Sequence, residues 1–462
     1  MKRILYILIS TMVSCQLISA RANGQNYEKI HLAVDTNKVL IKDFVGFGAE
    51  WDPGFWAEYN VRQGINNTDW DLETRRIAWM RLPFVRMFML TQWVTNGDSM
   101  YSWDNPQLED LYKYLNFCQR EHITVFLTDW GIHESWEKVP GFTGNSDPRY
   151  AETIGKYLDY LINHKGYSCI KYFIFVNEPN FEAGGWGAWE KGIDNISKII
   201  KERRLPVKLV GSDEVAGFGW QIKTVDSLRN KFSVWDMHEY VPQKQIISGA
   251  FEDTLAKDWE IVKRNDPNWK NKFLMLAEIG ASDGDIGAAI NDSSDTYGYG
   301  LNMADMAVQA TLAGTSAISA WMLGDESHEG FDMGMWKNKA GNFQLRPWFY
   351  AWTLLTRHFT ERSKIFDDIR KYKEFRYLIA ETKDDNWSIC LINRGNDELD
   401  VTLNGNLFGK SKTFYLSSYN DKYLALDFSG FLVPIKKLFL DAGRGLSVHV
   451  PPHCIIVLST FN

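Results

Sequence analysis

Short apolar runs alternate with longer amphipathic stretches from about residue 41 to residue 359. The apolar runs are rich in Val, Ile, Leu and Phe and carry few charges, which is typical of strands buried on both faces of a parallel sheet. Eight such runs occur, at 45–48, 84–88, 124–128, 172–176, 208–211, 234–237, 273–277 and 317–321. The pattern predicts eight parallel strands.

The stretches between these runs have helical periodicity. Asp147 and Pro148 form an N-cap with proline in the first turn, and the apolar residues Tyr150, Ile154 and Tyr157 follow at helical spacing. The stretches 108–115 and 193–200 repeat this spacing. Eight strand–helix units in one run predict a closed (β/α)8 TIM barrel over residues 41–360. An open doubly wound sheet is the alternative, but the glycine-rich phosphate turn usual in such sheets does not follow any early run.

The pattern of apolar and polar positions changes after a helix predicted over 346–358. From about residue 365 the chain alternates apolar and polar positions between turn-forming segments at 393–396, 404–406 and 441–443. This alternation predicts a C-terminal antiparallel β-sandwich domain over 361–462. Residues 23–40 alternate in the same way, and we expect them to join that domain.

The first 22 residues have the form of a signal peptide. A basic start at Lys2 and Arg3 precedes an apolar stretch, and Ala20-Arg21-Ala22 is a small-x-small cleavage site. We therefore expect a secreted or periplasmic protein. A loose lipoprotein box ending at Cys15 is the alternative. It would anchor the protein to a membrane at the cell surface, but the apolar residues after Cys15 disfavour it.

Composition narrows the class of partner. The 462 residues include 51 basic and 58 acidic side chains, a formal net charge of −7, so nothing indicates nucleic-acid binding. The 19 Trp, 20 Tyr and 27 Phe can fill a core or stack on sugar rings. The cysteines at 118, 169, 390 and 454 fit no zinc site, and we expect no metal or cofactor. Disulfides joining 118 to 169 or 390 to 454, and four buried thiols, both remain open.

Two glutamates stand where a barrel carries its catalytic groups, just after strands. Glu178 follows the fourth apolar run and Glu278 follows the seventh. A single acidic residue at a strand end is usually a cap or an ion-pair partner. A pair on facing strands is what glycoside hydrolysis requires, because one carboxyl protonates the leaving oxygen while the other attacks the sugar or activates water.

Asn177-Glu178-Pro179 at the fourth strand, with a second glutamate at the seventh, resembles the clan A glycoside hydrolases. The resemblance covers the predicted barrel, and the β-domain built from both chain ends resembles that of families thirty and thirty-nine. The Gly46-Phe47-Gly48 strand is closer to family thirty, whereas Trp186 and Trp189 after the motif are closer to thirty-nine. The exact family stays open between these two.

The resemblance implies retaining double displacement on a β-linked polysaccharide or oligosaccharide. Glu278 would be the ionised nucleophile and Glu178 the protonated acid that later acts as base, with carboxyl groups ~5–5.5 Å apart. By position, Asn177 matches a residue that binds the sugar 2-hydroxyl and Arg86 one that keeps the nucleophile ionised, with Arg81 as its rival. His238 and Tyr240 match residues that bond the nucleophile or the sugar, and Trp321 matches the aromatic floor.

Further aromatic and polar residues follow other strands, and each is as well explained by packing as by sugar binding. They are Trp51, Trp130, His133, Trp186, Trp336 and Asp129. Glu50 and Glu239 are rival carboxylates, but we expect Glu50 to lie too far around the barrel from the pair. Loops 282–300 and 324–344 are expected to shape the cleft, and the acidic residues in the first have no EF-hand spacing.

Three other functions compete with the hydrolase. A non-catalytic glycan-binding protein would not need either glutamate. A metal-dependent barrel hydrolase would carry paired histidines at a strand end, and this sequence has none. A surface-anchored scaffold depends on lipidation at Cys15. The sequence therefore favours the hydrolase.

Overall fold

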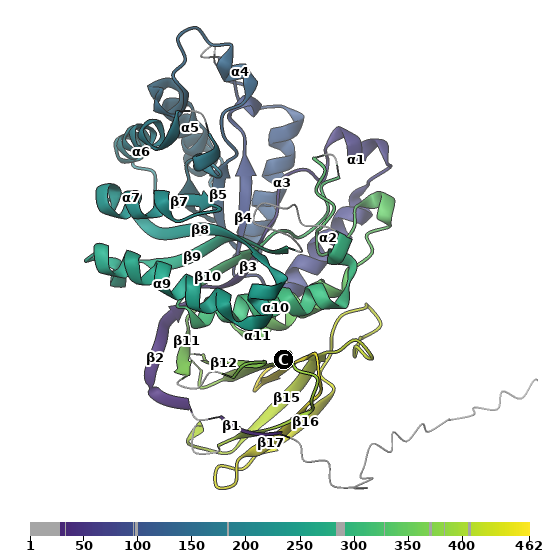
Figure 1. The fold of residues 1–462 in the computed structure, drawn as a ribbon. Coiled ribbons are helices and arrows are strands. Elements are labelled where there is room, and N and C mark those ends of the chain that lie inside the picture. Colours follow the sequence, from purple (N-terminus) through teal and green to yellow (C-terminus); the bar gives the residue numbers. More distant parts are fainter. Residues whose placement is uncertain are drawn as a thin grey trace, which may run out of the picture.

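The computed structural model describes residues 28–462 apart from 33, 96, 98–99, 183, 283–291, 328, 369–371, 383 and 405–407. The expected signal peptide, Cys15 and residues 283–291 of the acidic loop that begins at Ser282 lie outside the described residues. Two bodies are stacked, with a barrel above and a smaller β-domain below (Figure 1). None of the helices in the described part of the chain is long and apolar enough to cross a membrane.

Eight parallel strands close the barrel in the order β10-β3-β4-β5-β6-β7-β8-β9. They are β3 (Gly46–Glu50), β4 (Phe84–Met89), β5 (Thr124–Asp129), β6 (Ile170–Ile174), β7 (Lys208–Val215), β8 (Phe232–Pro242), β9 (Phe273–Ser282) and β10 (Ala317–Ala320). Each of the eight predicted runs overlaps one of these strands, which confirms the predicted barrel. β7, β8 and β9 continue four or five residues beyond the predicted runs, and these extensions carry part of the site described below.

Small and apolar residues fill the barrel. Phe84, Phe126, Ile174 and Met275 belong to a buried interior cluster. Gly48 on β3 packs so closely on Phe84 that a Cβ atom there would lie 2.4 Å from the ring. This close approach explains why glycine occupies position 48 of the Gly46-Phe47-Gly48 strand.

Helices cover the outside of the barrel. They are α1 (Glu58–Arg62), α2 (Asn67–Met80), α3 (Pro106–Glu121), α4 (Glu134–Glu137), α5 (Pro148–Asp159), α6 (Gly185–Glu202), α7 (Gly219–Leu228), α8 (Gln243–Ser248), α9 (Ala250–Asn265), α10 (Tyr297–Leu312) and α11 (Pro347–His358). The predicted start of α5 is correct, since Asp147 Oδ1 accepts from the backbone N–H of Arg149 at 2.9 Å and Pro148 is the first helical residue.

The β-domain contains two sheets. Three strands pair in the order β1 (Glu28–Leu32), β14 (Leu399–Leu403) and β17 (Leu446–Val450). Seven pair in the order β16 (Lys436–Leu440), β15 (Lys412–Tyr419), β18 (Cys454–Ser459), β13 (Trp387–Asn393), β12 (Phe375–Glu381), β11 (Ser363–Asp368) and β2 (Val34–Phe44). Both N-terminal strands therefore lie in this domain, and β2 runs to Phe44, beyond the boundary expected at 40. All pairings in the domain are antiparallel except β1 with β14.

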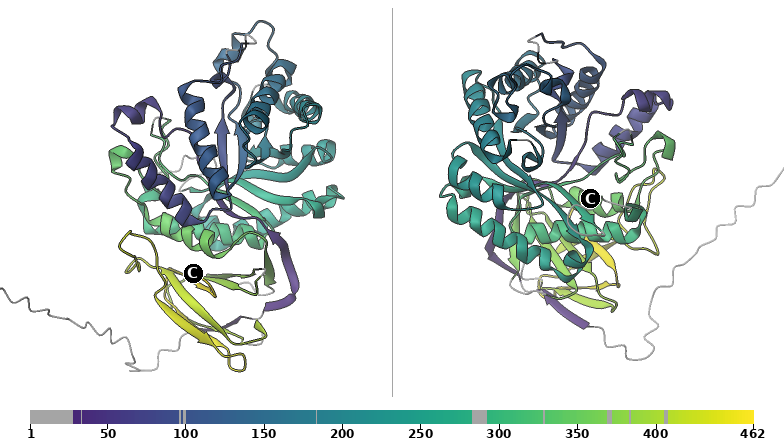
Figure 2. Two further views of the ribbon diagram at one scale, coloured as in Figure 1. Left: turned by 180° about the vertical axis from the view of Figure 1, so that it is seen from behind. Right: turned by 45° about the horizontal axis from the view of Figure 1, so that its top comes forward.

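Buried polar contacts join the two bodies. Asp305 on α10 forms ion pairs with Arg376 at 3.2 Å and Arg394 at 3.5 Å, and these arginines belong to β12 and the loop after β13. Tyr297 and Tyr419 stack 4.2 Å apart, and the hydroxyl of each donates to the main-chain carbonyl of the other at 2.9 Å. The β-domain thus packs along α10 and α11, on the side of the barrel away from the upper loops (Figure 2). The four cysteines in the described chain are buried thiols.

Candidate active site

Glu178 lies at the turn that follows β6. Its backbone is left-handed (φ 45°, ψ 53°), and the short 3-10 turn η4 (Pro179–Phe181) begins directly after it. The amide of Asn180 fixes this turn to β7, donating to the Val215 carbonyl at 2.9 Å and accepting from its N–H at 3.2 Å. The Glu178 side chain keeps 24% exposure, so it can exchange a proton with water or a leaving group.

Glu278 lies opposite on β9 and is far more buried, with 5% side-chain exposure. Its Oε1 accepts from Arg86 Nη1 at 2.7 Å, and its Oε2 accepts from the Tyr240 hydroxyl at 2.6 Å. One carboxylate oxygen of Glu278 lies within 4.8 Å of one of Glu178. The two glutamates predicted from the sequence therefore face each other across one cleft.

Arg86 on β4 is fully buried and holds several acceptors at once. Besides Glu278, its guanidinium donates to Glu50 at 3.0 Å, Asn177 at 2.8 Å and Asp213 at 3.1 Å. Burial disfavours the charged form, but Glu50, Asp213 and Glu278 outweigh it and raise the pKa of Arg86 well above its usual value. Asn177 uses its carbonyl oxygen here, which leaves its amide N–H groups as donors.

His238 on β8 links the acid/base candidate to a carboxylate that sequence reasoning missed. Its Nδ1 lies 3.0 Å from Glu178 Oε1 and its Nε2 lies 2.9 Å from Asp213 Oδ1. Burial lowers the pKa of His238. The Asp213 and Glu278 carboxylates raise it by more than burial lowers it, so the pKa lies well above its usual value. The pKa of Asp213 is held low by His238 and Arg86 against the effect of burial. With both ring nitrogens protonated, His238 can donate to one carboxyl oxygen of Glu178 and one of Asp213.

Opposing influences act on Glu278. Burial raises the pKa of its carboxyl above the ordinary value, with a contribution from the charge of Glu178. The His238 and Arg86 charges and the Tyr240 hydroxyl act in the other direction. Since both of its oxygens accept short hydrogen bonds, the neighbours are arranged to stabilise the carboxylate form against the cost of desolvation.

The pair opens into a cleft of about 870 Å³. Asn177, His238, Tyr240, Trp130 and Trp321 line it, as expected for groups that contact a sugar. Trp321 packs edge-on against Phe331 at 5.2 Å, while Trp130 keeps 41% exposure. Sequence reasoning missed three aromatic side chains of the lining: Phe181, Phe218 and Phe331. Phe181 could have been found, because it comes three residues after Glu178 and must lie near it.

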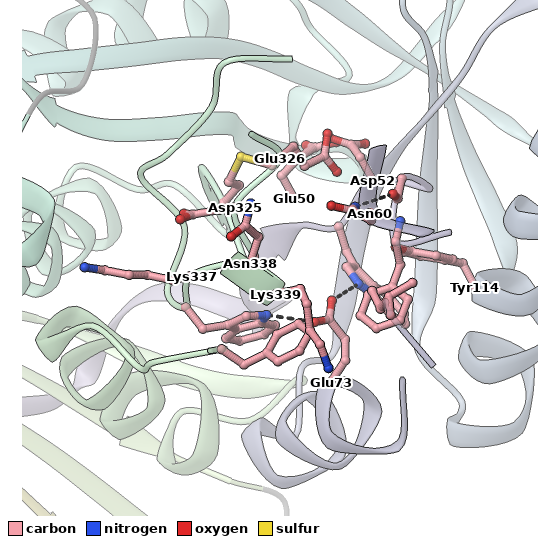
Figure 3. A pocket seen from close by; sticks show the side chains of 18 residues that line it. Glu50, Asp52, Asn60, Glu73, Tyr114, Asp325, Glu326, Lys337, Asn338 and Lys339 are labelled. Carbon is pink, nitrogen blue, oxygen red and sulfur yellow. Dashed lines mark hydrogen bonds between the residues drawn. The ribbon is translucent and has the colours of Figure 1, made fainter. Parts of the chain in front are cut away.

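Trp51 and Trp336 do not line the cleft, so of their two expected roles, packing and sugar binding, the structure corrects the second. Both are buried, and their indole N–H groups donate to the Glu73 carboxylate at 3.1 Å and 2.8 Å. They border a separate small hollow, in which Glu73 lies across from Glu50, Asp52 and Glu326 (Figure 3). Trp51 also stacks on Trp70 at 5.8 Å. Their role in this structure is packing.

Three further candidates also lie away from the cleft lining. Trp186 packs in the first turn of α6 with its indole N–H 3.5 Å from the Thr224 hydroxyl, and His133 caps α4 through Ser135. Asp129 is buried and accepts from Tyr150. Strand-end position alone placed these residues near the site, but Trp186 and Asp129 contact neighbouring helices and His133 is an exposed helix cap.

The structure distinguishes the rival carboxylates Glu50 and Glu239 from the pair, and Arg81 from Arg86. Glu50 is near the pair after all, because Arg86 bridges it to Glu278, yet it does not line the cleft. Glu239 lines the cleft beside His238. Arg81 ends α2 and lies within 3.4 Å of the main-chain oxygen of Asn462, far from Glu278 in the barrel, so Arg86 is the arginine of the site.

Glu178, His238 and Glu278 are also the one trio of described residues whose ligand atoms gather closely enough for a metal ion. A cation there would meet the guanidinium of Arg86, 2.7 Å from Glu278, and an imidazolium whose two nitrogens already face carboxylates. The trio therefore fits an acid–nucleophile pair better than a metal site.

No family model matches the sequence, and no curated protein matches it either. Solved structures do match, and together they show that the chain has the fold of clan A glycoside hydrolases, among them family 30. An endoxylanase of family 30 from Clostridium papyrosolvens is 13% identical with a TM-score of 0.66, and the match covers 93% of this chain and 98% of that one.

Two other solved structures share the same fold. A family 30 xylanase from Talaromyces cellulolyticus is 12% identical with a TM-score of 0.67, covering 94% of this chain and 99% of its own. An α-L-arabinofuranosidase from Thermotoga maritima is 12% identical with a TM-score of 0.63, again covering 94% and 99%. At such identities the likeness establishes architecture, and the site must carry the argument about activity.

Proposed function

We propose that this protein is a retaining glycoside hydrolase that cleaves β-glycosidic bonds in a polysaccharide or oligosaccharide. The observation that carries the proposal is the pair Glu178 and Glu278, with carboxylate oxygens within 4.8 Å in one cleft. Retaining enzymes need such a short separation, whereas inverting enzymes hold the two groups ~6.5–9.5 Å apart to admit water.

Two steps follow from the geometry. In the first, a Glu278 oxygen attacks the anomeric carbon while Glu178 transfers its proton to the departing oxygen, leaving a glycosyl ester. In the second, Glu178 takes a proton from water, whose oxygen attacks the same carbon and releases Glu278. The greater exposure of Glu178 suits proton exchange, and the Arg86 and Tyr240 contacts suit a carboxylate that must leave as well as attack.

The test is a panel of aryl β-glycosides and polysaccharides given to wild type, Glu278→Ala, Glu178→Ala and the control Glu202→Ala. Glu202 is an exposed residue of α6. We expect both site variants to fold and to lose roughly 10²- to 10⁴-fold or more in kcat, with the control unchanged. Azide should partly restore Glu278→Ala and give a glycosyl azide of inverted configuration. Near-wild-type turnover by either variant would refute its role, and a wild type that binds but never cleaves would indicate a glycan-binding protein.

Export belongs to the same proposal, because a polysaccharide substrate lies outside the cell. The signal-like pattern of residues 1–22 supports it. The mass of the mature protein from a secreting host distinguishes the outcomes. A chain that begins at Asn23 supports cleavage after Ala22, whereas a lipid-modified Cys15 would show membrane anchoring.

A further inference from the structure

Glu50 is a buried carboxyl that the two steps above do not use. It ends β3 and pairs in register with Arg86 on the neighbouring strand β4, and both side chains have 0% exposure. The Trp51 N–H donates to the main-chain carbonyl of Arg86 at 2.9 Å, which fixes the two strand ends at this level. Because residues in register on adjacent strands are direct neighbours, the backbone itself places Glu50 beside the guanidinium.

Glu50 and Glu278 share one nitrogen of that guanidinium. Arg86 Nη1 donates to Glu50 Oε2 at 3.0 Å and to Glu278 Oε1 at 2.7 Å, while Nη2 donates to Asn177 and Asp213. Each of these nitrogens carries two hydrogens, so all four have an acceptor, whereas Nε has none among the described residues. Since the guanidinium is planar and rigid, the acceptor that holds one Nη1 hydrogen also sets the direction of the other.

Glu50 can hold this hydrogen without competing for the charge of Arg86. Burial, followed by the neighbouring Asp52 carboxyl, raises the pKa of Glu50 well above its usual value, with a smaller contribution from Glu278, while Arg86 acts in the other direction. Glu326, in the loop after β10, lies close enough to interact with Glu50 as well. At acidic pH Glu50 is therefore an uncharged acceptor, and the charge of Arg86 remains available to Glu278.

We propose that Glu50 is a positioning residue of the reaction, which holds one Nη1 hydrogen of Arg86 and thereby directs the other at the Glu278 carboxylate. This inference rests on the proposed hydrolase. Glu50 does not line the cleft, so it acts through Arg86 and not on the sugar. Without it the guanidinium can turn, and a hydrogen bond weakens steeply as its angle departs from linearity. A less well aligned donor stabilises the ionised form of Glu278 less, so the pKa of Glu278 should rise.

The test compares Glu50→Met, which fills the space without an acceptor, with Glu50→Gln, which keeps a carbonyl oxygen for Nη1. Glu50→Ala takes the place of Glu50→Met if that variant does not fold. On an aryl β-glycoside we expect Glu50→Met to lower kcat about tenfold or more with little change in KM, and to move the acidic limb of the kcat/KM profile to higher pH. Glu50→Gln should recover most of the kcat and return the limb to its wild-type position.

A double-mutant cycle with Arg86→Lys asks whether Glu50 acts through the guanidinium. In the Arg86→Lys background the loss of Glu50 should cost little more, because residues that act through one contact are not additive. The matched control is Glu73→Ala, another buried glutamate, whose carboxylate accepts from Trp51 and Trp336. It should lower the free energy of unfolding, leave the acidic limb in place and add independently to Arg86→Lys.

Wild-type kcat and an unmoved limb in folded Glu50→Met would overturn the inference while the hydrolase stands, and so would fully additive losses in the cycle. If wild type cleaves no donor, the hydrolase proposal fails, and modification of Glu278 by a small alkyl epoxide tests Glu50 alone. The ionised carboxylate attacks an epoxide carbon and opens the ring, the alkoxide takes a proton from water, and an ester remains. The rate of this mass gain against pH gives the ionisation midpoint of Glu278. A higher midpoint in Glu50→Met than in wild type and Glu50→Gln supports the inference, and equal midpoints overturn it.

Discussion

The Arg86 guanidinium and the Glu278 carboxylate lie 2.7 Å apart although 192 residues separate them in the chain. Arg86 is fully buried and also donates to Glu50, Asn177 and Asp213. One cation therefore holds the nucleophile candidate, the Asn177 amide and the partner of His238 together. Because a planar guanidinium can reach four acceptors and an ammonium group cannot, the residue type matters as well as the charge.

Arg86→Lys tests that dependence. The substitution keeps a positive charge but cannot satisfy all four acceptors, so Glu278 and Asn177 lose their shared alignment. We expect kcat to fall about 100-fold on an aryl glycoside, a loss typical of removing one preorganised donor. Steady-state kinetics with circular dichroism as a folding control measures it. A folded variant with wild-type kcat would mean that Arg86 does not position Glu278.

Tyr240→Phe removes the 2.6 Å hydrogen bond to Glu278 Oε2 and little else. The hydroxyl lowers the pKa of Glu278, so its loss should raise that pKa and move the acidic limb of the kcat/KM profile to higher pH. We also expect kcat to fall about tenfold or more, in line with a hydrogen bond to a charged group. A lower kcat with an unmoved acidic limb would contradict the role given to the hydroxyl.

Asp213→Asn acts on the proton of His238. Asp213 is the main carboxylate that raises the pKa of His238, so the amide should let that pKa fall and His238 lose its charge at lower pH. The alkaline limb of the activity profile should then shift toward lower pH. Asp226→Asn on α7 serves as the charge-matched control. An alkaline limb that stays in place would show that His238 does not set it.

The sequence allowed the barrel, and the position of Glu178 and Glu278 at its mouth, to be predicted because both depend on local patterns. A strand buried on two faces must be apolar, and a polar residue at its end must lie at the mouth of the barrel. Asp213 was not predicted as a site residue because the apolar run was taken to end at Gly211, whereas β7 continues to Val215. Glu50 was placed too far away because its link to Glu278 passes through a third residue, Arg86.

The mistakes over tryptophans have another cause. Position at a strand end says which loop carries a side chain but not where that side chain points. Trp51 and Trp336 point inward and donate hydrogen bonds to Glu73. Glu73 belongs to α2, and the pattern of strands gives no sign that it lies beside these two tryptophans. Trp130, by contrast, packs edge-on against Phe88 at 4.6 Å and keeps 41% exposure at the cleft.

Trp130→Ala should therefore affect catalysis, whereas Trp51→Phe should affect stability. The first removes an exposed ring from the cleft, so we expect kcat/KM to fall about tenfold or more while unfolding is unaffected. The second removes a buried hydrogen bond to Glu73, so it should lower the free energy of unfolding by about 1–3 kcal/mol and change kcat/KM little. Denaturant unfolding and steady-state kinetics on both variants measure this. A reversed pattern would return Trp51 to the substrate site.

Asp110→Asn tests the stability cost of a buried carboxyl on α3. Asp110 Oδ2 accepts from the Trp56 N–H at 3.0 Å, Oδ1 has no partner, and burial raises the pKa of Asp110 to about 7. In the unfolded chain the carboxyl of Asp110 ionises near pH 3.9. The raised pKa of Asp110 in the folded protein must therefore lower the stability of wild type as the pH rises from about 4 to about 7, and this group causes no additional loss above that range. The amide keeps the acceptor and removes the titration. Asp110→Asn should thus exceed wild type in Tm by about 2 °C or more at pH 8 and by less at pH 5. Glu109→Gln, exposed on the same helix, should show no such dependence, and a pH-independent gain in Asp110→Asn would refute the explanation.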